Sequence, residues 1–219
     1  MTIRAVIFDL DGVIADSEPI SGKSTAMVLG KRGIRLTDEE RRLAFGRRSP
    51  DIFRDALRSR GMKFARVDIE TMVGEKNAIM LDLMKGNLKA VPGSLELIGF
   101  LSGKGLKLAL ATSSHRDKME MELRELGINE LFPIIVTGDD VSKGKPDPEI
   151  FLLAARRLGV PPSECAVIED SAFGVQAAKR AGMFAIGFAS RNSPGQDLSG
   201  ADFVVSDLGE AAAFISRAL

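Results

Sequence analysis

The segment FDLDGVIADSEP at residues 8–19 constrains the fold of this chain more than any other part of it. It ends an apolar run on Asp9 and places a second carboxylate, Asp11, two residues later, with Gly12 directly behind. A short apolar run closed by a glycine turn is typical of a buried strand in a parallel sheet. Open α/β sheets bind their ligands at the carboxyl ends of such strands. We therefore expect both carboxylates at a ligand-binding edge.

The chemistry of this carboxylate pair has more than one interpretation. In an extended stretch, Asp9 and Asp11 would point to the same side, because side chains alternate with period two. Two carboxylates at such a short distance repel each other unless a cation lies between them or one carries a proton. The pair therefore indicates a Mg²⁺ site, a nucleophile with an acid/base partner, or both together. The alternative is a solvated turn, since Asp and Gly are ordinary turn residues.

Strand-like and helix-like patterns alternate along most of the chain. Apolar runs typical of strands lie at residues 4–9, 106–112, 133–137, 165–169, 184–188 and 202–205. Amphipathic patterns typical of helices lie between them at residues 117–126, 148–158 and 172–181. This alternation predicts an α/β fold, a doubly wound, Rossmann-like parallel sheet with helices on both faces.

The stretch from residue 15 to residue 86 breaks this alternation, because it contains helical patterns and no convincing strand. One helix is expected to begin at Ser49 and Pro50, and another to cover residues 68–85. We therefore predict an inserted all-helical cap domain over the carboxyl end of the sheet. The predicted bounds are 15–86 for the cap, and 1–14 with 87–219 for the α/β core.

Two further strand ends carry residues suited to bind a phosphate. An apolar run leads into Thr112, Ser113 and Ser114, whose hydroxyls and backbone N–H groups suit a phosphate or oxyanion. Lys145 lies between a glycine and a proline turn just before a helix, where an ammonium can bind phosphate and carboxylate. The alternatives are a plain helix N-cap by Ser113 or Ser114, and a solvated turn lysine.

A fourth strand end carries paired carboxylates. Val167 and Ile168 lead into Glu169 and Asp170, and paired carboxylates suit a hard cation such as Mg²⁺. The alternative is that Asp170 only caps the next helix. None of the four strand ends decides the function alone. Together they bring carboxylates, hydroxyls and an ammonium to one edge of the predicted sheet.

Four motifs, in order, give the chain a resemblance to a known family. DLDG at residues 9–12, the Thr112 segment, GKPDPEIF at 144–151 and VIEDSAFGV at 167–175 resemble the motifs of the haloacid dehalogenase-like superfamily of phosphotransferases. The resemblance covers essentially the whole chain, including the helical insertion after the first motif. It is strongest toward the branch of small sugar-phosphate phosphatases and β-phosphoglucomutases.

The resemblance implies a reaction and assigns roles to the motif residues. Asp9 would attack phosphorus and form an aspartyl-phosphate, while Asp11 would act as general acid and then as general base. Thr112 and Lys145 would hold the phosphoryl oxygens. The cofactor that the resemblance implies is Mg²⁺, which offsets the repulsion between nucleophile and phosphate. Its implied ligands are Asp9, the backbone carbonyl of Asp11, Asp170, and Glu169 directly or through water.

The resemblance also bears on substrate binding and on the class of enzyme. The mutases carry a histidine in the first cap helix where this chain has Ser21, and this difference favours a hydrolase. We expect substrate contacts from arginines at a cap helix entrance and from residues at a core helix entrance, namely Arg47, Arg48, Ser113, His115 and Arg116. The alternative is that these arginines and the histidine are solvated first-turn residues.

The predicted function is that of a Mg²⁺-dependent phosphatase acting on a small phosphorylated metabolite, with a sugar phosphate expected, through an aspartyl-phosphate. The alternatives are a β-phosphoglucomutase-type phosphosugar mutase and a non-catalytic binding module. Thirty basic and thirty acidic residues balance, so we expect no nucleic-acid or membrane partner. A single cysteine and the absence of a signal-peptide pattern favour the cytoplasm. We expect a monomer, since no coiled-coil heptad is visible.

Overall fold

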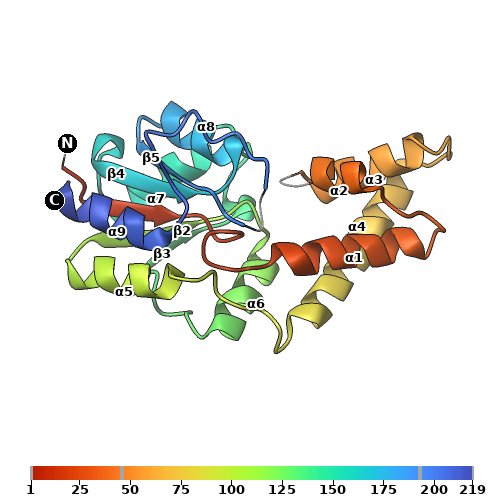
Figure 1. Cartoon of the computed structure of the whole chain (residues 1–219), viewed down its shortest axis with the longest axis horizontal. Helices are drawn as coiled ribbons and strands as arrows, with labels where there is room; N and C mark the ends of the chain where they lie inside the picture. Colours follow the sequence, from red (N-terminus) through yellow and green to blue (C-terminus); the bar gives the residue numbers. More distant parts are fainter. Residues whose placement is uncertain (1, 45–46, 192–193, 219) are drawn as a thin grey trace. The chain divides into compact units, whose positions relative to one another are not determined.

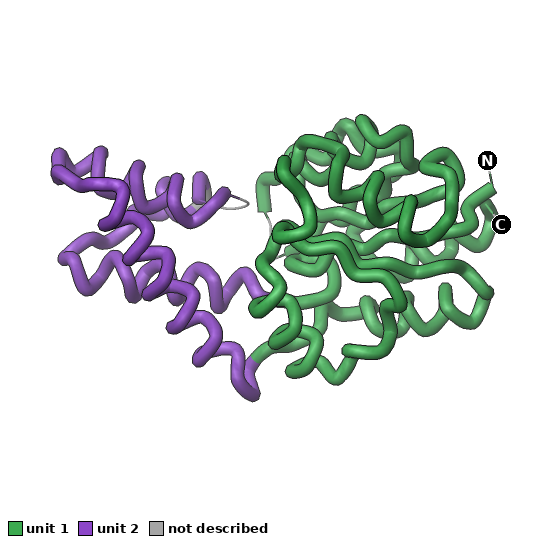
Figure 2. Tube along the Cα trace, turned by 180° about the vertical axis from the view of Figure 1, so that it is seen from behind, with its two compact units in different colours: residues 1–16, 88–219 green, residues 17–87 purple. Residues whose placement is uncertain are grey.

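The computed structural model describes residues 2–44, 47–191 and 194–218 (Figure 1). The chain divides into two compact units, unit 1 with residues 1–16 and 88–219, and unit 2 with residues 17–87 (Figure 2). Unit 2 begins two residues and ends one residue later than the predicted cap. The shift at its start has a local cause, because Ala15 bridges to Ala90 and the Asp16 N–H donates to the Lys89 carbonyl.

Unit 1 is built on one parallel sheet, and this confirms the predicted fold class and all six expected strands. The strand order is β3-β2-β1-β4-β5-β6. The strands are β1 (Ala5–Phe8), β2 (Lys107–Ala111), β3 (Ile134–Val136), β4 (Cys165–Glu169), β5 (Phe184–Phe188) and β6 (Phe203–Val205). From β1 the chain continues to β2 and β3 on one side, and it then returns to β4, β5 and β6 on the other side of β1. The strand order therefore reverses at β1. Ligands of doubly wound sheets bind at such a reversal.

Both faces of the sheet are apolar because both are covered by helices. Val6 and Phe8 of β1 pack on one side, and Ala5 and Ile7 pack on the other. The first side is covered by α5 (Ser94–Gly103), α6 (Arg116–Leu126) and α9 (Leu208–Arg217). The second side is covered by α7 (Glu149–Leu158) and α8 (Ala172–Arg180) (Figure 1). Short 3₁₀ turns, η1 (Gly138–Asp140) and η2 (Pro162–Glu164), precede α7 and β4.

The described secondary structure of unit 2 is entirely helical. It consists of α1 (Glu18–Gly30), α2 (Asp38–Ala44), α3 (Ser49–Arg58) and α4 (Arg66–Met84). A separate apolar cluster holds α1, α3 and α4 together, with Phe53, Leu29 and Met72 buried in it. No helix in the described ranges is both long and apolar enough to cross a bilayer.

Phe53→Ala should selectively weaken unit 2, because Phe53 is fully buried in the cluster that holds α1, α3 and α4. Removing a buried phenyl ring costs about 3–5 kcal/mol through lost burial and the cavity left behind. Native-state hydrogen exchange should report this loss for amides of unit 2, with smaller changes in the strands of unit 1. The control is Leu43→Ala in α2, where a 59% exposed side chain should change the opening free energy little. An equal loss of protection in both units would contradict an independent core in unit 2.

Candidate active site

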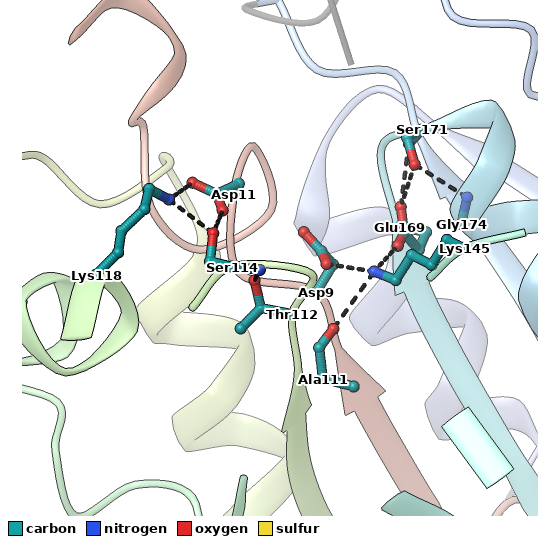
Figure 3. A network of polar contacts seen from close by, with 10 residues as sticks. All are labelled: Asp9, Asp11, Ala111, Thr112, Ser114, Lys118, Lys145, Glu169, Ser171 and Gly174. Atoms are coloured by element: carbon teal, nitrogen blue, oxygen red, sulfur yellow. Dashed lines mark hydrogen bonds and ion pairs between the residues drawn. The ribbon is translucent and has the colours of Figure 1, made fainter. Parts of the chain in front are cut away.

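The carboxyl ends of three adjacent strands bring the predicted site residues of unit 1 together. Because β1 pairs with both β2 and β4, the residues that follow Phe8, Ala111 and Ile168 lie at one edge of the sheet. The Asp9 N–H extends the ladder by donating to the Ile168 carbonyl at 3.0 Å. The side chains that meet at this edge are drawn in Figure 3.

Lys145 lies at the centre of this cluster. Its Nζ donates to Asp9 Oδ1 at 2.5 Å, to Glu169 Oε1, and to the Ala111 carbonyl at 3.4 Å (Figure 3). Only 7% of its side chain is exposed. The alternative of a solvated turn lysine is therefore wrong, and the ammonium links the strand ends of β1, β2 and β4.

The cluster is short of positive charge. Burial raises the pKa of Asp9 to about 7, Lys145 opposes this shift, and Glu169 adds to it. Burial disfavours the ammonium of Lys145, but Asp9 and Glu169 together raise its pKa above the ordinary value. One ammonium is thus shared by two buried carboxylates, and Asp170, the residue after Glu169, is buried as well. Buried oxygen donors in excess of the positive charge fit a hard divalent cation.

The Glu169 carboxylate is fixed on both of its oxygens. Oε1 accepts from Lys145, while Oε2 accepts from the Ser171 N–H at 3.2 Å and from Ser171 Oγ at 2.9 Å. Ser171 Oγ in turn accepts from the Gly174 N–H at 3.0 Å, which makes Ser171 the N-cap of α8. The alternative of Asp170 as this N-cap is therefore wrong.

The three side chains of the predicted Mg²⁺ ligand set, those of Asp9, Glu169 and Asp170, are not grouped as a metal site. Among the described residues, no three Asp, Glu, His or Cys side chains are grouped so that they could hold a metal ion. Glu169 binds Lys145 and Ser171, and the Asp11 carboxylate binds other partners. The carboxylates of Asp9 and Asp170, with the backbone carbonyl of Asp11, remain as a donor set of the right chemistry.

The carboxylates of Asp9 and Asp11 bind different lysines, unlike the shared side expected from an extended stretch. Strand β1 ends at Phe8, so period-two alternation does not continue through Asp11. Lys118 Nζ of α6 donates to Asp11 Oδ1 at 2.6 Å, and Ser114 Oγ donates to Asp11 Oδ2 at 2.8 Å (Figure 3). The two carboxylates therefore bind different ammonium groups, and Asp9 shares Lys145 with Glu169.

Lys118 and Glu122 were missed by sequence reasoning. Lys118 Nζ lies 2.9 Å from Glu122 Oε1, and the Glu122 side chain is fully buried. Burial and the nearby Asp11 raise the pKa of Glu122 to about 8, against the effect of Lys118. Burial lowers the pKa of Lys118, but Asp11 and Glu122 outweigh it and raise that pKa overall. A signal was present, since Glu122 lies three residues after Met119 on the apolar side of α6.

Of the predicted phosphate-binding segment, Thr112 is buried and Ser113 is exposed. Thr112 Oγ1 accepts from the Ser114 N–H at 3.1 Å. The N-cap residue of α6 is His115, without a side-chain cap, so the alternative of a serine N-cap is wrong. A Cβ on Gly138 would come 2.5 Å from the Ser113 carbonyl, so only glycine lets the two loops approach this closely.

The exposed substrate-contact candidates of unit 1 are paired with carboxylates of η1. His115 is 79% exposed and its Nδ1 lies 2.6 Å from Asp139 Oδ1. The Arg116 guanidinium pairs with Asp140 Oδ2 at 3.0 Å. Both residues lie on the segment that follows the predicted phosphate-binding loop, and their contact with substrate stays a prediction.

Arg47 and Arg48 belong to unit 2 and pair there with α3. Arg47 binds Asp55 at 2.7 Å, and Arg48 binds Asp51 at 3.1 Å. The Arg48 side chain is 84% exposed, as expected from the alternative of a solvated arginine at the helix entrance. A role of either arginine in substrate binding stays a prediction.

Unit 2 also holds a buried lysine that sequence reasoning missed. Lys76 Nζ donates to Ser21 Oγ at 3.0 Å and to Ser49 Oγ at 2.9 Å. The hydroxyl at residue 21, the position where the mutases carry histidine, is thus engaged inside unit 2.

Comparison with models of known families identifies the family to which the chain belongs. Residues 6–188 match the model of the family described as haloacid dehalogenase-like hydrolase. The chain belongs to the haloacid dehalogenase-like hydrolases. The matched range contains every site residue of unit 1 described above, from Asp9 to Gly174.

Individual members of this family are similar to the chain over most of its length. It is 38% identical over 185 residues to a phosphorylated carbohydrates phosphatase of Thermotoga maritima, covering 83% of this chain and 82% of that protein. It is 34% identical over 209 residues to a β-phosphoglucomutase of Bacillus subtilis, covering 93% and 89%. The structure of CbbY from Rhodobacter sphaeroides in complex with phosphate matches with a TM-score of 0.82 at 29% identity, covering 95% and 96%.

Gly174→Ala should destabilise this haloacid dehalogenase-like hydrolase, because a Cβ there would lie 1.9 Å from Glu169 Cδ. Displacing Glu169 strains the bonds to Ser171 and Lys145, and overpacking of this kind costs about 1–3 kcal/mol. Denaturant unfolding measures the loss. The matched control is Gly99→Ala, a helix position with no atom within 4 Å of the new Cβ. It should stabilise by about 0.5–1 kcal/mol, and equal effects of the two substitutions would contradict the close packing.

Proposed function

We propose that the protein is a phosphatase that hydrolyses a small phosphorylated metabolite through an aspartyl-phosphate on Asp9. The observation that carries the proposal is the buried Lys145 ammonium held between Asp9 and Glu169 at the edge where the strand order reverses. An anionic nucleophile can approach an anionic phosphate only where positive charge offsets the repulsion. Lys145 supplies such a charge directly beside the Asp9 carboxylate.

In the proposed reaction, an oxygen of Asp9 attacks phosphorus while Lys145 and Thr112 bind phosphoryl oxygens. Asp11 donates a proton to the leaving alkoxide, and it then accepts a proton from the water that attacks the aspartyl-phosphate. The separate hydrogen-bond partners of the two carboxylates support this division between nucleophile and acid/base. Glu169 keeps Lys145 in place through its bond on Oε1.

Asp9, Asp170 and the backbone carbonyl of Asp11 would hold a Mg²⁺ ion in this proposal. When bound, the ion supplies a Lewis acid for the phosphoryl oxygens and further positive charge beside Asp9. The oxygen chemistry of these groups and the burial of both carboxylates support this donor set. In this assignment Glu169 acts on Lys145 rather than as a direct metal ligand.

A sugar phosphate is the substrate class that we propose. The support is the similarity to the phosphorylated carbohydrates phosphatase, together with Arg47, Arg48, His115 and Arg116 as donors for substrate oxygens. In this proposal unit 2 acts as a cap that excludes bulk water during the reaction. Balanced charge and a single buried cysteine, Cys165, support a monomeric cytoplasmic enzyme.

A phosphosugar mutase is the second candidate, favoured by the similarity to the β-phosphoglucomutase. Ser21, where the mutases carry histidine, supports the hydrolase instead. A mutase would return the phosphoryl group to the isomeric sugar, whereas a phosphatase gives it to water.

Phosphate release from a panel of sugar phosphates should depend on Asp9 and on divalent metal. Asp9→Asn removes the proposed nucleophile and should lower the rate by at least about a thousandfold. Chelation by EDTA should abolish release, and added Mg²⁺ should restore it. The control is Asp82→Asn on α4, an exposed carboxylate outside the proposed site, which should leave the rate unchanged. Undiminished release by Asp9→Asn would contradict the proposed nucleophile.

The same panel separates the phosphatase from the mutase. β-Glucose 1-phosphate supplied with a bisphosphate primer should yield glucose and inorganic phosphate. Accumulation of glucose 6-phosphate with little free phosphate would contradict the phosphatase and establish the mutase. Absence of any turnover of the panel would favour the non-catalytic binding module.

A further inference from the structure

Two ionisable residues of α6, Lys118 and Glu122, have no part in the proposed reaction, although Lys118 contacts Asp11 directly. Lys118 is 22% exposed and the Glu122 side chain is completely buried. Burying charged side chains costs free energy unless they are paired, and breaking such a pair leaves an uncompensated buried group. Glu122 lies where α6 packs its apolar side on the sheet, so an apolar residue would fill this position without that cost.

The geometry fixes the Lys118 ammonium from two sides. Its Nζ donates to Asp11 Oδ1 at 2.6 Å and lies 2.9 Å from Glu122 Oε1, one helical turn further along α6. It also donates to Ser114 Oγ at 3.0 Å, and that hydroxyl donates to Asp11 Oδ2 at 2.8 Å. Both oxygens of Asp11 are thus held by a closed set of contacts from α6 and the turn before it (Figure 3).

The Lys118 ammonium gives the Asp11 carboxylate a cationic partner other than Lys145. The other buried ammonium described at this edge of the sheet is that of Lys145, which Asp9 and Glu169 already share. Competition for Lys145 would draw Asp11 toward the nucleophile and away from the leaving group. Lys118 removes that competition, and Glu122 keeps Lys118 from turning toward solvent.

We propose that Lys118 and Glu122 are positioning residues that hold the Asp11 carboxylate in place for acid/base catalysis. This inference rests on the proposed phosphatase function. Asp11 remains the group that touches the reacting atoms, while Lys118 and Glu122 act only through it. The same contacts in a merely structural role would tie the turn after β1 to α6 without any effect specific to proton transfer.

The test compares two aryl phosphates whose leaving groups differ in their need for a proton. p-Nitrophenolate leaves readily without protonation, whereas phenolate is more basic and gains more from a general acid. The readout is kcat/KM, which reports steps up to the first irreversible one and so excludes the later attack of water on the aspartyl-phosphate. Asp11→Asn gives the pattern for loss of the acid itself.

Lys118→Met should lower kcat/KM for phenyl phosphate by roughly tenfold to a hundredfold and for p-nitrophenyl phosphate by less than about threefold. Lys118→Arg should recover part of the activity, because it restores a charged donor to Asp11. Glu122→Gln keeps the side-chain shape and should show the same selective loss at smaller size. The matched control is Lys179→Met, which removes a helical lysine paired with Asp202 away from the site and should change neither value.

Different failures point to different conclusions. An equal fall for both substrates in Lys118→Met and Glu122→Gln, accompanied by a lower melting temperature, would overturn the inference in favour of a structural role. Unchanged kcat/KM in both variants would overturn it as well. If Lys118→Met does not fold, Lys118→Arg and Glu122→Gln carry the same comparison. A wild-type protein that releases phosphate from no aryl or sugar phosphate would overturn the proposed function itself.

Discussion

The ion pair between Lys145 and two buried carboxylates is the constraint on which the rest of the site depends. Strands β1 and β4 are neighbours in register, so Asp9 and Glu169 come together as soon as the sheet forms. Two buried carboxylates this close are unfavourable without a cation. Lys145 supplies it from the loop before α7, and Ser171 with Gly174 keeps Glu169 aimed at it. The sheet topology thereby fixes the position of Asp9, the proposed nucleophile.

The site pairs the proposed nucleophile and the proposed acid/base carboxylate with different lysines. Asp9 binds Lys145 on the side of β4, while Asp11 binds Lys118 on the side of α6. A nucleophile and an acid/base group need different environments, although only one residue lies between them in the sequence. Strand β1 ends at Phe8, so Asp9 and Asp11 lie beyond the regular strand and their side chains reach different partners.

The sequence predicted the six strands and the polar residues that follow them, because apolar strands and the polar residues that end them are local signals. The predictions failed where the direction of the chain or a tertiary contact determines which residues a side chain meets. The end of β1 at Phe8 separates the two aspartates, and no local pattern shows this. Glu122 and Lys76 are charged residues on helices, and such residues are ordinarily solvated, so their burial follows only from packing. Unit 2 begins later than the predicted cap because Ala15 forms a bridge with Ala90 of unit 1.

The central claim is that Asp9 carries the phosphoryl group during turnover. In the most direct measurement, the enzyme is mixed with Mg²⁺ and a sugar phosphate that it hydrolyses, and the reaction is quenched in acid within milliseconds. The phosphorylated peptide is then mapped by mass spectrometry. The account predicts a transient phosphoryl group on the peptide that contains Asp9, and no such group in Asp9→Asn. Turnover with no phosphorylated peptide at any time, or with the group on another residue, would contradict it.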